Sequence, residues 1–313
     1  MSESRVLIEI GGTQLRFIQL GPQQQLADGQ VEQFAYPHKA GLRAWLQAKA
    51  AAHPMRILAA VAAPVVHDRG MACATLPARR LMLTAGELAQ WLGGTEALVY
   101  NDLQAAAMGL ALLIPEQRRL LCGRPPEPNA EPELLLNLGT GIGVSLLINS
   151  GAASQALASE AGMMDFRPPD VDDALARALQ GDFQRSHCAL YVHPQSVLQL
   201  LKQLQHPCAA GGLEAVMAQR DEPAVASALQ RYSLWLGHYA GNLTLSFAAW
   251  GGLNFCGGAF ECIREGINWS TFAQGYCVAR SHRARLEQVP IWAVEHPQLT
   301  LLGLDRLAAT APG

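Results

Sequence analysis

The chain has 313 residues, of which 50% are hydrophobic and 16% are charged, and its formal net charge is -3 at pH 7. This length predicts two domains rather than one small core. The lack of a basic excess argues against nucleic acid as an obligate partner, because no surplus positive charge is available to neutralise phosphates.

The cysteines and the first residues favour a cytoplasmic location. The seven cysteines are scattered without a C-x-x-C pair, which is typical of reduced thiols and not of a disulfide framework or zinc site. No basic segment followed by an apolar one begins the chain, so we expect no secretory signal. Residues 233–250 are mostly apolar over a membrane-spanning length, but His238 and Asn242 interrupt them and Arg231 lies just before them. We therefore expect a long buried helix and no membrane span.

Residues 6–20 (VLIEIGGTQLRFIQL) predict a strand, a glycine turn and a second strand, because branched aliphatic residues recur at every second position. The turn at Gly11, Gly12 and Thr13 exposes successive N–H groups and a hydroxyl, which suits phosphate oxygens. Glu9 lies two residues before the turn, where its carboxylate could hold a metal-bound water. An ordinary Gly-Gly hairpin explains the same stretch when it is taken alone.

The next residues alternate between helix and strand patterns. We expect a helix at 41–52, a buried central strand at 56–66, a short hairpin or loop at 72–83, a helix from a capping box at 84–87 to 92, a strand at 97–100 and a helix at 103–113. This alternation predicts an α/β fold with a mainly parallel sheet.

Asn101 and Asp102 directly follow a predicted strand, at the sheet end where α/β active sites gather. A carboxylate there could take the proton from an attacking hydroxyl while the amide positions the substrate. The alternative is structural, with Asp102 capping the following helix and Asn101 in the turn.

A proline-rich loop at 123–133 precedes a second strand–glycine turn–strand pattern at 134–148 (LLLNLGTGIGVSLLI), which suggests an internally duplicated fold. Its turn contains Gly139, Thr140, Gly141 and Gly143. A dinucleotide fingerprint does not fit, because a strand and not a helix follows the turn, and no Gly-Lys-Ser/Thr of a Walker A loop is present. Two Gly-Thr turns in equivalent places could instead hold a polyphosphate.

The remaining segments complete the second half of the predicted fold. We expect helices at 171–180, 196–205 and 223–249, strands at 253–256 and 290–294, a glycine turn at Gly257 and Gly258, and a C-terminal helix at 301–309. Glu160 is a second candidate acid, in a loop after the central turn, and a solvated loop acid is the alternative. The apolar helices at 223–249 and 301–309 could supply a homodimer surface, although core packing explains them equally well.

The order of these features resembles that of the bacterial glucokinase family, which belongs to the hexokinase-type sugar kinase, Hsp70 and actin superfamily. The ordered set is Glu9-x-Gly-Gly-Thr13, Asn101-Asp102, Leu138-Gly-Thr-Gly-x-Gly143, Glu160-Ala-Gly and Gly257-Gly258, and the ending Val294-Glu-His-Pro-Gln-Leu-Thr-Leu-Leu-Gly303 also looks like the C-terminal segment of this family. The resemblance covers nearly the whole chain.

The resemblance implies two RNase H-like domains of the actin and hexokinase type that flank a cleft. The smaller α/β domain would contain residues 1–112 and 300–313, closed by the C-terminal helix, and the larger would contain residues 113–299. ATP and Mg²⁺ would bind between them. Asp102 would be the base for the 6-hydroxyl of the sugar, with Asn101 and Glu160 binding that sugar.

The same resemblance assigns the glycine turns. Residues 11–13 would form the first phosphate motif, residues 139–143 the second, and residues 257–258 the adenosine motif. Glu9 would hold the metal through water.

Several positions depart from the family pattern. The first motif usually reads Asp-x-Gly-Gly-Thr-Asn, whereas Glu9 and Gln14 are each one methylene longer here. The Glu-Gly-Gly-His sugar loop reads Glu160-Ala161-Gly162-Met163, so a thioether replaces an imidazole. The Thr-Asn sugar segment should fall near residues 75–80, which contain no asparagine, and residues 189–193 lack an expected glutamate. The sugar pocket is therefore degenerate.

Two functions follow from this mixture. The first is ATP-dependent phosphorylation of a hexose, with glucose as the best single candidate, in glycolysis. The second is a glucokinase-like binding or regulatory protein that closes on a sugar or nucleotide with little or no turnover. The retained Asp102 favours the first, while Glu9, Met163 and the missing glutamate favour the second.

Overall fold

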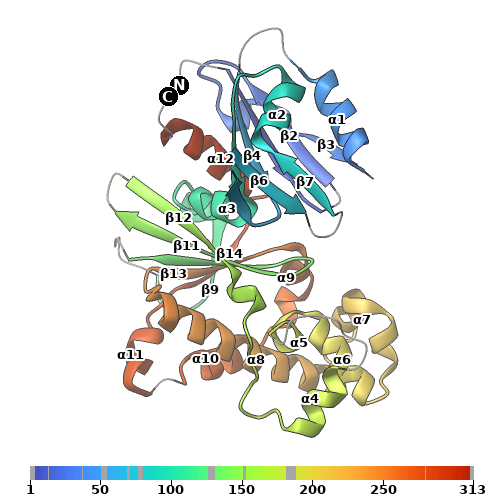
Figure 1. Ribbon diagram of the computed structural model, residues 1–313. Helices are drawn as coiled ribbons and strands as arrows, with labels where there is room; N and C mark the ends of the chain where they lie inside the picture. Colours follow the sequence, from blue (N-terminus) through green and yellow to red (C-terminus); the bar gives the residue numbers. More distant parts are fainter. Residues whose placement is uncertain are drawn as a thin grey trace. The chain divides into compact units, whose positions relative to one another are not determined.

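The computed structural model describes residues 4–12, 14–36, 38–50, 55–68, 71–76, 80–125, 131–150, 153–180, 188–278 and 280–310. The chain divides into two compact units (Figure 1). Unit 1 is formed by Met1–Leu113 and Pro297–Gly313, and unit 2 by Ile114–His296. Each unit is an α/β structure with its own hydrophobic core.

Unit 1 contains a five-stranded sheet in the order β3-β2-β1-β4-β8 and a three-stranded sheet in the order β5-β6-β7. The strands of the large sheet are β1 (Arg5–Ile10), β2 (Gln14–Leu20), β3 (Glu32–Ala35), β4 (Arg56–Val61) and β8 (Ala97–Asn101). The small sheet contains β5 (Val65–Asp68), β6 (Met71–Leu76) and β7 (Leu81–Thr84). Its helices are α1 (Lys39–Ala48), α2 (Ala85–Leu92), α3 (Asp102–Leu110) and α12 (Leu299–Thr310).

The alternation of apolar residues along β1 explains why this strand is buried on both faces. Val6, Ile8 and Ile10 belong to the core that α1, α2 and the small sheet complete, whereas Leu7 belongs to the core on the other face, with α3 and α12. A strand with apolar side chains on both faces is stable only between two covering layers. The central strand predicted over 56–66 is confirmed over Arg56–Val61, where β4 pairs in parallel with β1 on one side and β8 on the other. The rest of the prediction is wrong, because Val65–Asp68 forms β5 of the small sheet.

The predicted capping box before α2 is also confirmed. The Thr84 hydroxyl accepts a hydrogen bond from the Glu87 amide at 3.1 Å, and the Glu87 carboxylate accepts one from the Thr84 amide at 3.1 Å. The helix ends at Gly93, which has φ 72° and adopts the left-handed conformation that glycine tolerates best.

Unit 2 contains a six-stranded sheet in the order β12-β11-β10-β13-β14-β9. Its strands are β9 (Arg118–Cys122), β10 (Glu133–Leu138), β11 (Ile142–Ser150), β12 (Ala153–Ser159), β13 (Gly252–Cys256) and β14 (Ile291–Val294). Its helices are α4 (Asp173–Gln180), α5 (Ala189–Val192), α6 (Gln195–Gln203), α7 (Gly212–Ala218), α8 (Pro223–Phe247), α9 (Gly258–Ile263), α10 (Trp269–Tyr276) and α11 (Arg283–Leu286).

The pairing pattern of the large sheet in unit 1 recurs in unit 2. In each, a glycine hairpin joins the first strand to an antiparallel second strand, a third strand continues the meander, and two further strands add in parallel on the other side. This common order supports the internal duplication predicted from the two strand–turn–strand patterns. In unit 2, β9 adds one antiparallel strand beyond β14. Both large sheets are therefore mixed, and the mainly parallel sheet predicted from the sequence is wrong.

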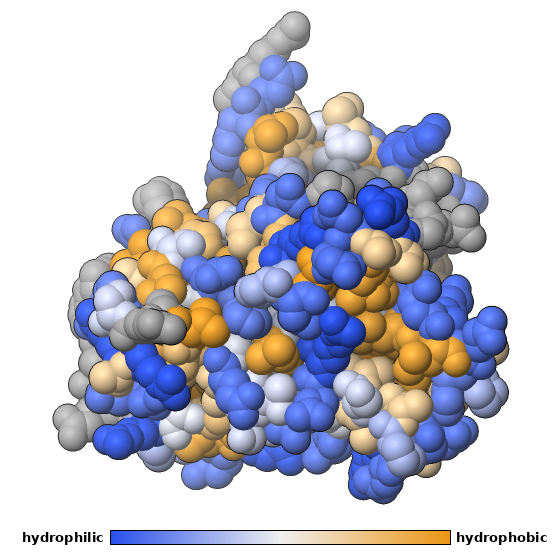
Figure 2. Space-filling model, turned by 90° about the horizontal axis from the view of Figure 1, so that it is seen from below, coloured by the Kyte–Doolittle hydropathy of each residue, from blue (hydrophilic) through white to orange (hydrophobic). Residues whose placement is uncertain are grey.

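The apolar segment predicted as a long buried helix is α8. Glu222 caps it by accepting hydrogen bonds from Ala224 and Val225, and Pro223 occupies its first turn. Among the described residues, no helix combines the length and the apolar character needed to cross a membrane. The face in Figure 2 carries mostly hydrophilic residues, with hydrophobic ones in several separate areas. The homodimer surface stays a prediction.

The contact between α3 and α12 in unit 1 yields a stability prediction. A Cβ at Gly303 would lie 1.6 Å from the Ala105 carbonyl oxygen, so Gly303→Ala should push α12 away from α3. Overpacking of this kind costs about 1–3 kcal/mol.

Gly86→Ala in α2 is the matched control, since the nearest neighbour of the added Cβ would be the flexible Met71 side chain at 3.4 Å. Replacing a helical glycine there should stabilise by about 0.5–1 kcal/mol. Urea unfolding of both variants tests the contrast, and equal stabilities would contradict the tight helix crossing.

Candidate active site

In unit 1, parallel pairing brings the ends of three strands to one edge of the sheet. Ile10 of β1 lies opposite Val61 of β4, and Val61 lies opposite Asn101 of β8. The loops that leave the carboxyl ends of parallel strands share this edge. The Gly11–Gly12 turn and the Asn101–Asp102 pair therefore belong to the same side of unit 1.

The first glycine turn is closed by backbone and side-chain hydrogen bonds. The Gly11 amide donates to the Gln14 carbonyl at 2.9 Å, and the Tyr36 hydroxyl donates to the Gly11 carbonyl. Thr13, predicted to supply a hydroxyl to phosphate, lies outside the described residues. Glu9 forms an ion pair with Arg16 directly across the hairpin, with 3.1 Å between Oε2 and Nη1. The metal-binding role of Glu9 stays a prediction. Its carboxylate already has the Arg16 guanidinium as a partner.

The helix-capping role considered for Asp102 in the sequence analysis belongs to Asn101. Asn101, and not Asp102, is the N-cap of α3, and its Oδ1 accepts from the Leu103 amide at 3.0 Å and the Gln104 amide at 3.1 Å. Its Nδ2 donates to the Ala63 carbonyl at 3.1 Å, which ties the end of β8 to the segment after β4. Asp102 is the first residue of α3, where the positive end of the helix dipole stabilises a carboxylate.

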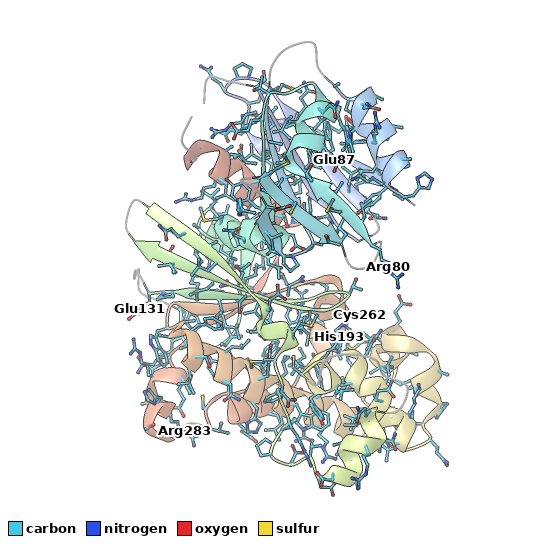
Figure 3. The ribbon with its side chains drawn as sticks, viewed as in Figure 1. Arg80, Glu87, Glu131, His193, Cys262 and Arg283 are labelled. Carbon is cyan, nitrogen blue, oxygen red and sulfur yellow. The ribbon has the colours of Figure 1, made fainter. Side chains whose placement is uncertain are left out.

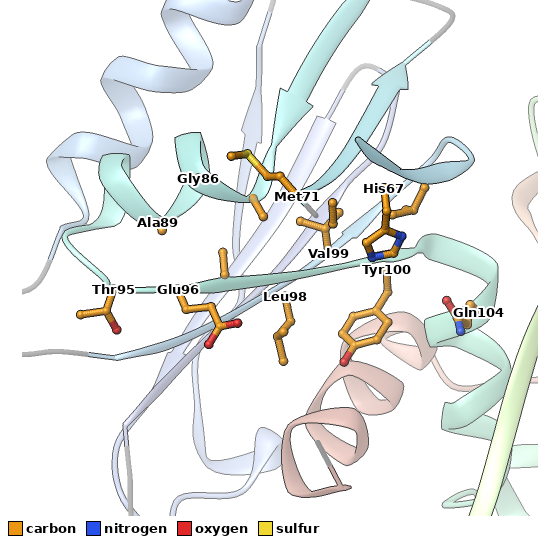
Figure 4. A pocket seen from close by; sticks show the side chains of 14 residues that line it. His67, Met71, Gly86, Ala89, Thr95, Glu96, Leu98, Val99, Tyr100 and Gln104 are labelled. Atoms are coloured by element: carbon orange, nitrogen blue, oxygen red, sulfur yellow. The ribbon is translucent and has the colours of Figure 1, made fainter. Parts of the chain in front are cut away.

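A cavity of about 690 Å³ lies beside β8 in unit 1 (Figure 4). Its walls come from β8, α2 and the β5–β6 hairpin, and include His67, Met71 and Glu96. Tyr100 and Gln104, which flank the Asn101–Asp102 pair in sequence, line it as well, whereas that pair does not. Burial raises the pKa of Tyr100, and the nearby charge of Arg56 partly opposes this. The cavity therefore adjoins the predicted catalytic pair without containing it.

In unit 2, the two remaining glycine turns meet at one sheet edge. Asn137 of β10 lies opposite Cys256 of the parallel strand β13, so the turns at 139–141 and 257–258 leave neighbouring strand ends. Gly257 has φ 104°, and a Cβ there would lie 2.2 Å from the Asn137 side-chain oxygen. Only glycine fits this contact.

Gly141 and Gly258 leave their backbone open. A Cβ added to either residue would meet no atom within 4 Å. Space beside an exposed glycine backbone lets a ligand approach closely. Thr140 and Gly141 are exposed, so the described part of unit 2 offers an accessible turn that suits phosphate oxygens.

The turn that carries Glu160 is packed against the start of β11. A Cβ at Gly162 would lie 2.0 Å from the Ile142 carbonyl oxygen, so the two segments touch through their backbones. The Tyr239 hydroxyl donates to the Ala161 carbonyl at 2.9 Å, and the Cys188 thiol donates to the Gly162 carbonyl at 3.4 Å. Burial raises the pKa of Tyr239, and it raises the pKa of Cys188 to about 11, so both donors keep their hydrogen at neutral pH. The turn that carries the exposed Glu160 therefore lies against Ile142, at the end of the second glycine turn.

Sequence reasoning missed the side chains that hold these turns from behind. Tyr36, Tyr239 and His193 each bond to a turn carbonyl from a position at least 25 residues away in sequence. No local sequence pattern indicates such a contact.

The residues described by the structure contain no cluster of three or more His, Cys, Asp or Glu that could hold a metal ion. Met163, beside Glu160, is 69% exposed.

Comparisons with known proteins agree over nearly the whole chain. The family model described as Glucokinase matches residues 6–311. A glucokinase of Paramagnetospirillum magneticum is 27% identical over 321 residues, which cover 98% of this chain and 98% of that protein. Among solved structures, glucokinase from Balamuthia mandrillaris in complex with glucose gives a TM-score of 0.77 at 17% identity, covering 98% of this chain and 94% of that one.

A second solved structure is a ROK family glucokinase from Streptomyces griseus in complex with glucose and AMPPNP. It gives a TM-score of 0.65 at 17% identity and covers 98% of this chain and 100% of that one. These likenesses confirm the α/β fold of the actin and hexokinase type that the sequence predicted.

The cap formed by Asn101 yields a second stability prediction. Asn101→Ala removes the side-chain acceptor of the Gln104 amide and the donor to Ala63, whereas the Leu103 amide keeps Asp102 Oδ1 as an acceptor at 2.9 Å. The free energy of unfolding should therefore fall by about 1 kcal/mol. Asn101→Asp keeps the capping oxygen but loses the donor to Ala63, so it should retain only the stability that the cap supplies. Chemical denaturation of both variants measures the difference. An alanine variant as stable as the parent would show that the cap contributes nothing.

Proposed function

The chain belongs to the glucokinase family, and we propose on that premise that it transfers the terminal phosphoryl group of ATP to the 6-hydroxyl of a hexose, with glucose as the first candidate. It is an ATP-dependent kinase of the hexokinase and glucokinase type. One observation carries the proposal: in each unit, the family's motif residues lie near the carboxyl ends of neighbouring parallel strands.

The glycine turns support the nucleotide part of this proposal. The open backbone at Gly141 and Gly258 leaves room for phosphates and adenosine next to adjacent strand ends. The Streptomyces griseus glucokinase, which shares the fold, was solved in complex with AMPPNP. We assign residues 11–13 and 139–143 to the phosphates and residues 257–258 to the adenosine.

Mg²⁺ would enter with the nucleotide rather than occupy a protein cage. Magnesium ions commonly keep several waters and bind through one or two carboxylates plus the substrate phosphates. The described residues hold no cluster of three metal-binding side chains. Glu9 is the acid we assign to the water shell, and it would have to share its carboxylate with Arg16. When bound, the metal would neutralise charge on the phosphates.

Asp102 supplies the base in this proposal. Its carboxylate takes the proton of the 6-hydroxyl, the hydroxyl oxygen forms a bond to the terminal phosphorus, and the bond from that phosphorus to ADP breaks. Asn101 has limited capacity to help, since its Oδ1 accepts from two amides and one of its two amide hydrogens is bound to Ala63. The remaining hydrogen can donate to a sugar hydroxyl.

Glu160 supplies an exposed carboxylate that can accept hydrogen bonds from sugar hydroxyls. Each sugar hydroxyl that lacks its partner in a buried site costs about 1–3 kcal/mol. Loss of the family's histidine and glutamate should therefore weaken glucose binding. A cytoplasmic location, a place in glycolysis and a homodimer remain proposals that accompany this activity.

Steady-state ADP production with Mg·ATP and a panel of hexoses tests the proposal. Asp102→Asn should lower kcat by about 100-fold or more, because general base catalysis contributes on that order. The KM for the sugar should change little, since the amide has the same shape. Asp221→Asn, at an exposed acid outside the site, is the matched control and should keep the parent rate.

Two outcomes would overturn the proposal. An Asp102→Asn variant that retains the parent kcat would remove Asp102 as the base. A parent protein that releases no ADP with any hexose at high millimolar concentration would remove the kinase activity and favour the regulatory alternative.

A further inference from the structure

His193 is a buried histidine that contacts the second phosphate turn. It is 2% exposed and lies between α5 and α6 in unit 2 (Figure 3). Its Nε2 lies 2.9 Å from the Gly139 carbonyl oxygen, and its Nδ1 accepts a hydrogen bond from the Gln195 amide at 3.2 Å. The residue has no role in the family motifs described above.

These two partners fix the protonation of the ring. The Gln195 amide can only donate, so Nδ1 carries no hydrogen, while the Gly139 carbonyl can only accept, so Nε2 carries one. The imidazole is therefore neutral, with the Nε2 hydrogen directed at the phosphate turn. Protonation would place a second hydrogen against the Gln195 amide.

Hydrogen bonds and buried side chains anchor the corner that holds His193. The His193 carbonyl accepts from the Ser196 amide at 2.8 Å, and the buried Tyr232 hydroxyl donates to the Val192 carbonyl at 3.1 Å. Residues 189–192 of α5 are all buried. The ring is thus anchored in the core, while the turn that it contacts is exposed.

The contact determines where the next amide points. In a trans peptide the C=O and the following N–H point in opposite directions. The described peptide bonds include no cis bond, so a Gly139 carbonyl directed at His193 turns the Thr140 N–H away from the core. Thr140 and Gly141 are both exposed, and a Cβ at Gly141 would meet no atom within 4 Å.

We propose that His193 is a positioning residue for nucleotide binding, which aims the Thr140 amide of the second phosphate turn at a phosphate oxygen. The inference rests on the proposed function, because it takes the ligand of this turn to be ATP. His193 itself does not touch the ligand. His193 holds the Thr140 amide in place in the ligand-free protein, so that nucleotide binding does not have to order the second glycine turn.

Two substitutions at His193 separate this role from a general structural one. His193→Asn can keep the acceptor for Gln195 but cannot reach Gly139, whereas His193→Gln can place its amide nitrogen near the Nε2 position and restore the donor. The asparagine variant should weaken binding of Mg·AMPPNP about 3- to 10-fold, as expected for one lost hydrogen bond. Its affinity for the sugar should stay at the parent value, and the glutamine variant should bind both ligands like the parent.

His206 provides a matched control. Its Nδ1 accepts from the Cys208 amide two residues later, as in His193, but its Nε2 pairs with Glu222 at 3.2 Å rather than with a site turn. His206→Asn should leave the nucleotide affinity unchanged. Calorimetric titration of each variant with Mg·AMPPNP and with the sugar gives the affinities. The Thr140 amide resonance of the ligand-free protein should shift in His193→Asn and not in His193→Gln.

The outcomes are distinguishable. Unchanged nucleotide affinity in His193→Asn, or an equal loss of nucleotide and sugar affinity, overturns the positioning role. If the parent still turns over, the proposed kinase activity stands without it. A parent that neither binds Mg·AMPPNP nor produces ADP removes both proposals.

Discussion

Parallel pairing of neighbouring strands determines which loops of this chain can meet. In unit 1 it sets the end of β1 in register with the ends of β4 and β8, and in unit 2 it does the same for β10 and β13. Since loops leave parallel strands at one edge, segments that are far apart in sequence arrive side by side. The duplicated order of the sheets creates two such edges, and each carries a glycine turn.

Side chains from the core then orient these loops by binding their carbonyl groups. Four contacts of this kind recur: Tyr36 to Gly11, His193 to Gly139, Tyr239 to Ala161 and Cys188 to Gly162. A carbonyl held toward the core turns the following N–H away from it. Donors held outward in this way suit ligands rich in phosphate and hydroxyl oxygens. Glycine occupies the positions where two backbone segments touch, as at Gly162 and Gly257.

Local sequence patterns predicted several strands and helix starts. Contacts between residues far apart in sequence could not be predicted. Period-two aliphatic residues located β1, an unbroken run of small apolar residues located β4, and the Thr84 capping box located the start of α2. Strand β12 (ASQALAS) escaped prediction because alanine and serine have weak strand preference, and pairing with β11 fixes it. The contact from Tyr239 to Ala161 joins residues 78 apart and leaves no local signal. The Glu9–Arg16 pair, in contrast, follows from the hairpin register itself.

We propose that the glycine turns at these sheet edges bind a nucleotide and that the acids beside them bind a sugar. Hydrogen-exchange mass spectrometry with Mg·AMPPNP and a hexose tests it most directly, because amides that bind ligand oxygens exchange more slowly. We predict added protection in peptides that contain residues 11–12 and 101–103 of unit 1 and residues 139–143, 160–163 and 257–258 of unit 2. Absence of added protection in the glycine turns would contradict a nucleotide-binding role for them.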